Sequence, residues 1–422
     1  MIQLRDYQED ISNKAAALLR DYGIAYLAME VRTGKTFTAF ATAQKYGAIS
    51  MLFITKKKAI SSIRKDYKAM APAFQIEVTN YEQVANMDGS LYDLIVLDEA
   101  HCLGQFPALA ERVKVLKKIC AGKPIIYLSG TPTPESYSQL YHQLCISTYS
   151  PFHDYPTFYK WAADFVTIGK KYFYNRQIND YSNANKTKID DKTRYLFLSF
   201  TQSQAGFKQE VKEEKIFVTM KPATYALAKR LARDRVYVSA ATGAEVLADT
   251  AAKLMQKLHQ IYSGSVIADN NDTGIIFDYS KIDLIKRCFT GKKIAIYYKF
   301  KAEEQMIRSA IGDGSLTTDP MEFNNREDKW FYSQVQSGRE GINLSTADAI
   351  IMLNIDFSAV SYWQARARMQ DKDRTKECLL YWIFAKDGIE EKIHKTVMSK
   401  RNYTLSHFKK DYGIKAEKEV QD

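Results

Sequence analysis

The chain has 422 residues, of which 46% are hydrophobic and 26% are charged, an ordinary composition for a globular protein. This length exceeds what one hydrophobic core usually supports, so we expect two domains. The 60 Lys and Arg residues outnumber the 49 Asp and Glu residues, and the formal net charge of +11 favours a polyanionic partner such as nucleic acid. Because no apolar run approaches the roughly 20 residues that span a bilayer, we expect no association with a membrane.

The five cysteines indicate a reducing compartment. They lie far apart and include no CxxC pair, which argues against a zinc ribbon and against a disulfide framework. The opening segment MIQLRDYQED is charged and lacks the apolar stretch of a signal peptide. We therefore expect a cytoplasmic protein.

Residues 1–150 alternate short apolar strands with amphipathic helices. The strand-like runs are Ser50–Thr55, Tyr92–Leu97 and Pro124–Ser129, and Ala108–Ile119 has apolar residues at helical spacing. Alternation of this kind predicts a parallel sheet covered by helices. Such sheets bind ligands at the carboxyl ends of their strands.

Residues 151–215 have a different character and are expected to form an accessory insertion or linker. The stretch is rich in aromatic residues and includes the aromatic and basic run KKYFYNR (Lys170–Arg176). Its segment Asn179–Arg194 is polar and is interpreted as an exposed loop. Aromatic residues at this density are typical of a packed subdomain core, although stacking on nucleic-acid bases is an alternative.

Residues 216–422 contain long helices over Thr224–Ser263 and then a second α/β alternation, which ends in a helical segment, DGIEEKIHKTVMSKRN. The expected strands are Lys293–Tyr298, Lys329–Val335, Ala349–Leu353 and Glu377–Ala385. Two α/β halves are what a duplicated nucleotide-binding fold would give.

The run VRTGKT (Val31–Thr36) has the character of a phosphate-binding loop. Its backbone N–H groups can surround a phosphate, Lys35 can place a cation on the β- and γ-phosphates, and the Thr36 hydroxyl can bind Mg²⁺.

The run LIVLDEAH (Leu94–His101) is an apolar strand that ends on paired carboxylates. Asp98 is suited to hold Mg²⁺, and Glu99 to position and deprotonate an attacking water molecule. A solvated acidic pair is the competing interpretation, but the phosphate loop upstream disfavours it. The two runs together predict hydrolysis of a nucleoside triphosphate.

Further segments in the same order resemble the motifs of superfamily-two helicases, and among them the Swi/Snf-type DNA translocases. The short chain is similar to phage- or prophage-encoded members of that group. The segments are LRDYQ (4–8), VTNYEQV (78–84), LSGTPTPES (128–136), SGREGINLSTADAIIMLN (337–354), WQARARMQ (363–370) and FAKDGIEEKI (384–393). The resemblance implies an α/β fold with two RecA-like parallel-sheet domains in tandem and an aromatic-rich, partly helical insertion between them.

The resemblance also implies ATP and Mg²⁺ as cofactors. Gln8 would read adenine, although a solvent-exposed glutamine at a helix start is an alternative. His101, Ser129 and Thr131 would couple the nucleotide state to the second domain, or the last two would simply build a turn. The implied nucleotide-binding residues are Arg5, Gln8, Thr33, Gly34, Lys35, Thr36, Gly341 and Arg366, with Thr36 and Asp98 on the metal.

Arg368 is the candidate for the arginine finger, which meets charge developing during phosphoryl transfer. The family's second motif arginine is replaced by Asp371, so Arg366 and Arg374 remain alternatives. The phosphate loop also departs from the usual pattern. Met29 stands where a strict motif has Gly, and Arg32 stands where Swi/Snf-type proteins usually have Gly.

For DNA, the resemblance implies contacts that are mainly to phosphates and carry little sequence information. The candidates are Thr55, Lys56, Tyr81, Ser333 and Gln334.

The leading hypothesis is an ATP-dependent DNA helicase or translocase that acts on single-stranded, duplex or forked DNA. The alternatives are a duplex translocase that remodels nucleoprotein without separating strands, an RNA helicase, and a DNA-binding scaffold that does not hydrolyse ATP. The chain shows no nuclease motif, so a separately encoded nuclease or replication protein is a possible partner.

Overall fold

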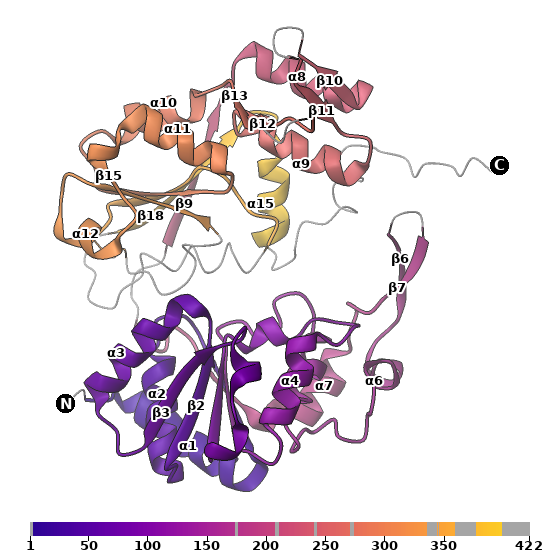
Figure 1. Ribbon diagram of the computed structural model, residues 1–422, viewed down its shortest axis with the longest axis vertical. Coiled ribbons are helices and arrows are strands. Elements are labelled where there is room, and N and C mark those ends of the chain that lie inside the picture. The colour runs from indigo at the N-terminus through magenta and orange to yellow at the C-terminus, as the bar shows by residue number, and fades with distance from the viewer. Residues whose placement is uncertain are drawn as a thin grey trace. The chain divides into compact units, whose positions relative to one another are not determined.

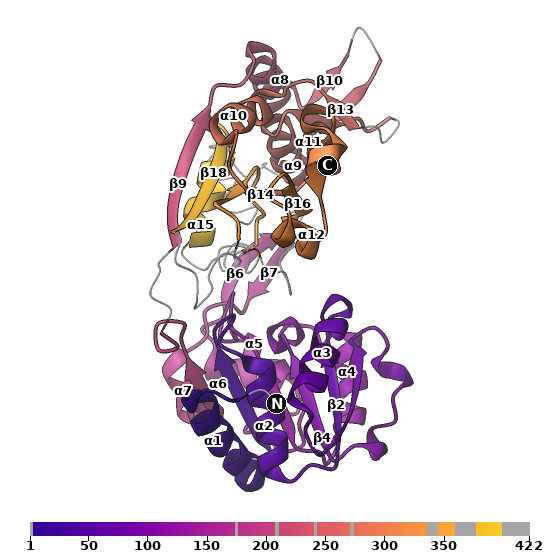
Figure 2. The same ribbon diagram turned by 90° about the vertical axis from the view of Figure 1, so that its left-hand side faces the viewer.

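The computed structural model describes residues 3–173, 176–206, 211–239, 243–270, 274–335, 344, 346–358 and 377–398 (Figure 1, Figure 2). Contacts between residues divide the chain into two compact units, Met1–Phe207 and Lys208–Asp422. Within the described part of the chain, no helix is long and apolar enough to cross a membrane.

The first unit is built on a six-stranded parallel sheet with the strand order β3-β2-β4-β5-β1-β8. The inner strands are continuous apolar runs, as expected where helices cover both faces. Because neighbouring strands are parallel, the loops that follow β1, β4 and β5 leave the sheet at the same edge. The strands are β1 (Ile24–Met29), β2 (Ser50–Thr55), β3 (Gln75–Asn80), β4 (Leu94–Asp98), β5 (Ile125–Leu128) and β8 (Phe197–Phe200).

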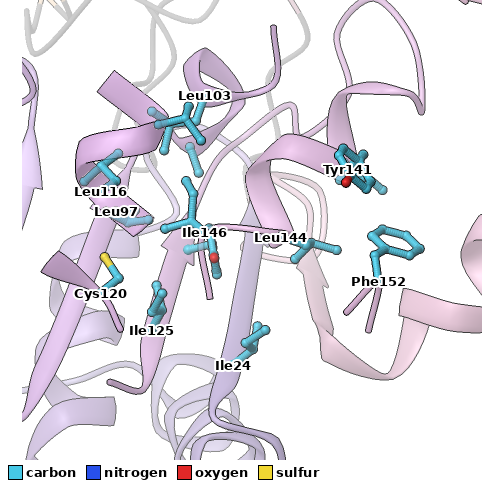
Figure 3. Close-up of a cluster of buried hydrophobic side chains, with 14 of the residues drawn as sticks. Ile24, Leu97, Leu103, Leu116, Cys120, Ile125, Tyr141, Leu144, Ile146 and Phe152 are labelled. Carbon is cyan, nitrogen blue, oxygen red and sulfur yellow. The ribbon is translucent and has the colours of Figure 1, made fainter. Parts of the chain in front are cut away.

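Alternate side chains of these strands enter two separate hydrophobic cores, one on each face of the sheet. On one face Leu97 packs with Leu116 and Leu144, and Figure 3 shows these side chains together. On the other face Phe53 packs with Phe40. The first face is covered by α4 (Glu111–Ile119), α5 (Gln139–Leu144), α6 (Phe158–Phe165) and α7 (Lys186–Thr193), and the second by α1 (Asp6–Tyr22), α2 (Lys35–Tyr46) and α3 (Ile60–Met70).

The segment 151–215, expected from the sequence as an accessory insertion, contributes strands to both sheets. Its strand β8 pairs with β1, and β9 (Val211–Val218) is the edge strand of the second sheet. The aromatic side chains of Phe158 and Trp161 are buried in the core of the first unit, where they pack against other apolar residues. Base stacking by the stretch Lys170–Arg176 stays a prediction. A hairpin of β6 (Gly169–Phe173) and β7 (Arg176–Asp180) extends from this unit (Figure 1, Figure 2).

The prediction of an exposed loop over Asn179–Arg194 is wrong for the second half of this segment, which forms α7. Asn185 caps this helix by accepting a hydrogen bond from the Lys188 N–H at 3.1 Å. Ile189 is fully buried and anchors the helix to the core. One cap and one apolar anchor were therefore enough to fold a segment whose composition is polar.

The second unit repeats the plan, with a six-stranded parallel sheet in the order β15-β16-β14-β17-β18-β9. Besides β9, its strands are β14 (Ile294–Tyr298), β15 (Leu316–Thr317), β16 (Trp330–Gln334), β17 (Ala349–Met352) and β18 (Cys378–Ala385). As in the first unit, the side chains of this sheet form two hydrophobic cores, one on each face. This arrangement confirms the expected α/β class, with two RecA-like parallel-sheet domains in tandem.

Two helices of the second unit, α8 (Pro222–Asp234) and α9 (Ala251–Tyr262), lie in the stretch Thr224–Ser263 that was expected to be helical, and the chain adds two hairpins. Between α8 and α9, where the sequence predicted only helices, the chain forms a hairpin of β10 (Val236–Val238) and β11 (Glu245–Leu247). A second hairpin pairs β12 (Ser265–Ile267) with β13 (Gly274–Ile276). The helices are α8 (Pro222–Asp234), α9 (Ala251–Tyr262), α10 (Ser280–Phe289), α11 (Lys301–Ile311), α12 (Pro320–Asn325) and α15 (Glu390–Met398).

A buried ion pair joins α10 to α15. The ammonium of Lys281 lies 2.6 Å from the Glu390 carboxylate, and both side chains are fully buried. The Lys281 Nζ also lies 3.5 Å from the Leu353 carbonyl oxygen, just beyond β17. The pair therefore ties the helix that ends the described chain to the centre of the second unit.

Replacing Lys281 with Met should destabilise the second unit by about 3–5 kcal/mol, because it leaves the Glu390 carboxylate buried without its partner. Urea unfolding followed by circular dichroism measures this loss. Lys286→Met on the same helix is the control, since Lys286 bonds the Ala310 carbonyl at the surface. Equal losses in the two variants would contradict the assignment.

Candidate functional site

The candidate site lies at the carboxyl edge of the first sheet, on three neighbouring strands. The loop after β1 leads to Lys35, β4 ends at Asp98, and the loop after β5 begins with Ser129. Since β4, β5 and β1 are adjacent in the sheet, these loops meet, although they come from distant parts of the sequence. This edge is where open α/β sheets bind ligands.

The phosphate loop runs from Glu30 to Gly34 and leads into α2 at Lys35. The Thr33 hydroxyl donates to the Glu30 carbonyl oxygen at 2.7 Å and tightens the loop. Gly34 has a φ of 84°, and a Cβ there would lie 2.1 Å from Nε2 of Gln8. The positive φ therefore favours glycine at this position, and a side chain there would also have to displace the Gln8 amide.

Arg32, inside this loop, has a φ of 63°. In this left-handed region a side chain with a Cβ costs roughly 1–2 kcal/mol. The loop thus keeps the backbone shape that glycine normally allows, but holds it under strain.

Lys35 points back along its own loop. Its Nζ donates to the carbonyl oxygens of Met29, at 3.0 Å, and Glu30, at 3.3 Å. A Cβ on Gly130 would lie 3.7 Å from this ammonium, so the loop after β5 passes close beside it. The ammonium group therefore lies beside the phosphate loop, where it could neutralise the charge of a β- or γ-phosphate.

Asp98 carries a partly buried carboxyl group that accepts hydrogen bonds from two donors. The Thr55 hydroxyl donates to Oδ2 at 2.7 Å, and the Glu99 N–H donates to Oδ1 at 3.0 Å. Burial and the charge of Glu99 raise the pKa of the Asp98 carboxyl to about 6, while Thr55 and Lys35 oppose the rise. A bound cation would stabilise the ionised form further.

These groups fit a Mg²⁺ ion that is shared with a nucleotide. Among the described residues, no group of three or more His, Cys, Asp or Glu side chains could hold a metal by itself. Mg²⁺ usually takes one or two carboxylates and completes its shell with substrate phosphates and water. Asp98, with the hydroxyl of Thr36 at the start of α2, supplies a donor set of that kind.

Glu99, His101 and Ser129 form a linked group beside Asp98. Glu99 has a φ of 51°, and its Oε2 lies 3.3 Å from Nδ1 of His101. The same Nδ1 lies 3.1 Å from the Ser129 hydroxyl, which accepts a hydrogen bond from the Thr131 N–H at 3.2 Å. His101 is nearly buried, so it connects the general-base candidate to the loop after β5.

Gln8 lies against the phosphate loop. Its amide Nε2 donates to the Gly34 carbonyl oxygen at 3.3 Å, and its Oε1 accepts from the Arg5 N–H at 2.9 Å. Its neighbour Tyr7 donates its hydroxyl to the Thr33 carbonyl oxygen and stacks on Phe200. The first helix is therefore a brace for the loop, and reading of adenine by Gln8 stays a prediction.

Two residues expected to contact DNA are engaged with Asp98. Thr55 is fully buried beneath its carboxylate, and the Tyr81 hydroxyl donates to its backbone carbonyl oxygen. Lys56, one residue beyond β2, is partly exposed. Their contacts with DNA stay predictions.

The remaining predicted residues belong to the second unit. Ser333 and Gln334 lie at the carboxyl end of β16, where the Gln334 Nε2 donates to the Lys299 carbonyl oxygen at 2.8 Å. Gly341, Arg366 and Arg368, together with Asp371 and Arg374, lie outside the described residues.

Sequence reasoning missed one residue of the loop's surroundings, Gln202. Its side chain donates a hydrogen bond to Val31, 171 residues earlier, and its backbone N–H donates one to Glu30, 172 residues earlier. A polar stretch such as Thr201–Gly206 carries no local signal for such a contact, because only the pairing of β8 with β1 creates it.

No family model matches the chain. Over 123 residues it is 32% identical to the chromatin remodeling factor mit1 of Schizosaccharomyces pombe, and this match covers 28% of the chain. The chain spans only 8% of the length of that protein. The chain is also similar to the solved Sulfolobus solfataricus SWI2/SNF2 ATPase core in complex with dsDNA, at 17% identity and a TM-score of 0.44, covering 97% of this chain and 92% of the other.

Proposed function

We propose that this protein is a DNA-dependent ATPase that moves along DNA by cycles of ATP binding and hydrolysis. The observation that carries the proposal is the meeting of Lys35, Asp98 and Glu99 at one edge of the first sheet, with Lys35 close enough to lower the pKa of Asp98. A cation for phosphates, a carboxylate for Mg²⁺ and a second carboxylate for water are the parts that phosphoryl transfer to water requires.

In this proposal the chain's own residues divide the work. Lys35 leaves the carbonyl oxygens of Met29 and Glu30 and neutralises the transferring phosphate. Asp98 and Thr36 would hold Mg²⁺, which supplies charge neutralisation when it is bound. Glu99 orients the attacking water and accepts its proton.

The link from Glu99 through His101 to Ser129 supports a second role, the coupling of hydrolysis to movement. A change in the position of Glu99 on hydrolysis would alter its contact with His101 and hence with the loop after β5. Such a shift between two arrangements is how ligand binding biases a conformational equilibrium.

For the mode of movement, we propose a translocase or helicase on DNA, and favour a duplex translocase that remodels nucleoprotein. The local similarity to a chromatin remodeling factor supports this choice. The net charge of +11 supports a polyanionic track in either case.

Glu99→Gln should lower the ATP turnover rate by about 10²–10⁴-fold while nucleotide binding persists, because the amide cannot accept the proton of water. Lys35→Ala should instead weaken nucleotide binding itself. Steady-state hydrolysis and binding of a fluorescent ATP analogue separate the two effects. Normal turnover in Glu99→Gln would exclude the proposed base.

ATP hydrolysis should be stimulated by DNA and not by RNA, and DNA binding should weaken steeply as salt rises through counterion release. The assay compares no nucleic acid, single-stranded DNA, duplex DNA, forked DNA and RNA. Best stimulation by duplex, without displacement of a strand from the fork, is the result expected of a remodelling translocase. Stimulation by RNA alone would overturn the assignment to DNA.

Thr55→Val should shift the acidic limb of the pH profile of kcat/KM upward by about one pH unit. The change removes the hydroxyl that stabilises ionised Asp98, so the pKa of this carboxyl rises above its value of about 6 and a higher pH is needed to ionise it. Thr42→Val is the control, because the Thr42 hydroxyl bonds a backbone carbonyl inside α2. An unshifted limb would show that Asp98 does not have to be ionised.

A further inference from the structure

Gln202, directly after β8, is bonded to the phosphate loop at two points. Its side-chain Nε2 donates to the Val31 carbonyl oxygen at 3.0 Å, and its backbone N–H donates to the Glu30 carboxylate at 2.8 Å. The Glu30 N–H in turn donates to the Phe200 carbonyl oxygen at 2.9 Å. The first residues of the phosphate loop are therefore attached to the chain that leaves the last strand of the sheet.

The bond from the Gln202 side chain falls on the strained part of the loop. The Val31 carbonyl belongs to the peptide unit that leads into Arg32, whose φ of 63° is unfavourable for a residue with a Cβ. Rotating that peptide unit would relieve Arg32, but it would also carry the Val31 oxygen away from Gln202. A strained conformation persists only where its surroundings hold it, and Gln202 is placed to do so.

We propose that Gln202 is a positioning residue for the nucleotide, one that keeps the phosphate loop in its binding-competent shape against the strain at Arg32. This inference rests on the proposed function, since it assumes that the loop binds ATP. Gln202 acts through the Val31–Arg32 peptide unit, which orients the N–H groups that follow it toward the phosphates.

The test uses Gln202→Met, which keeps the side-chain length and removes the donor. Affinity for a fluorescent ATP analogue should fall by about threefold to tenfold, the effect of one neutral hydrogen bond. Gln204→Met is the matched control, because the Gln204 Oε1 accepts hydrogen bonds from Thr201, three residues away in the chain. A melting curve establishes that each variant is folded.

Arg32→Gly separates positioning from a general structural role. Glycine adopts positive φ without strain, so the loop should keep its shape without help from Gln202. The affinity loss caused by Gln202→Met should therefore be markedly smaller in the Arg32→Gly protein than in the wild type.

The outcomes distinguish this inference from the proposed function. A wild-type protein that binds no ATP overturns the proposed function, and the inference with it. If the wild type binds ATP and Gln202→Met binds it equally well, only the inference fails. Equal losses from Gln202→Met in both backgrounds also overturn it, because the strain at Arg32 would then play no part.

Discussion

The partly buried carboxyl group of Asp98 is the constraint on which the first unit's site depends. A carboxylate taken out of water must be given hydrogen-bond donors or a cation. Thr55 from β2 and the N–H of Glu99 supply two donors, and Lys35 from the loop after β1 supplies charge nearby. Burial and the charge of Glu99 still raise the pKa of this carboxyl to about 6, and a bound divalent cation would stabilise its ionised form.

The phosphate loop is held both by its own hydrogen bonds and from outside. Within it, the hydroxyl and the N–H of Thr33 donate to the Glu30 carbonyl oxygen. Gln8 and Tyr7 hold it from α1, and Gln202 holds it from the end of β8. This external bracing makes an arginine tolerable at the positive φ of Arg32.

The second unit follows the same rule at the carboxyl edge of its own sheet. Asn354, just beyond β17, donates to the buried carboxylate of Glu303 at 2.7 Å and bonds the buried ring of His259. The same Glu303 accepts from the N–H groups of Lys299 and Phe300 that follow β14, each at 2.8 Å. Polar groups thus fix the ends of adjacent strands in both units, through hydrogen bonds to partners that are distant in sequence.

By itself, the sequence determined the fold class and the strands β2, β4, β5, β14, β16, β17 and β18, and it singled out Lys35, Asp98 and Glu99 as candidates. Apolar runs of strand length and the motifs at their ends are local properties of the chain. It did not determine α7, because a single cap and the buried Ile189 decided that helix. Nor did it determine the roles of Thr55, Tyr81 and Gln202, whose partners are distant in sequence. Only the pairing of parallel strands brings these side chains to Asp98 and the phosphate loop, and burial there makes each hydrogen bond matter.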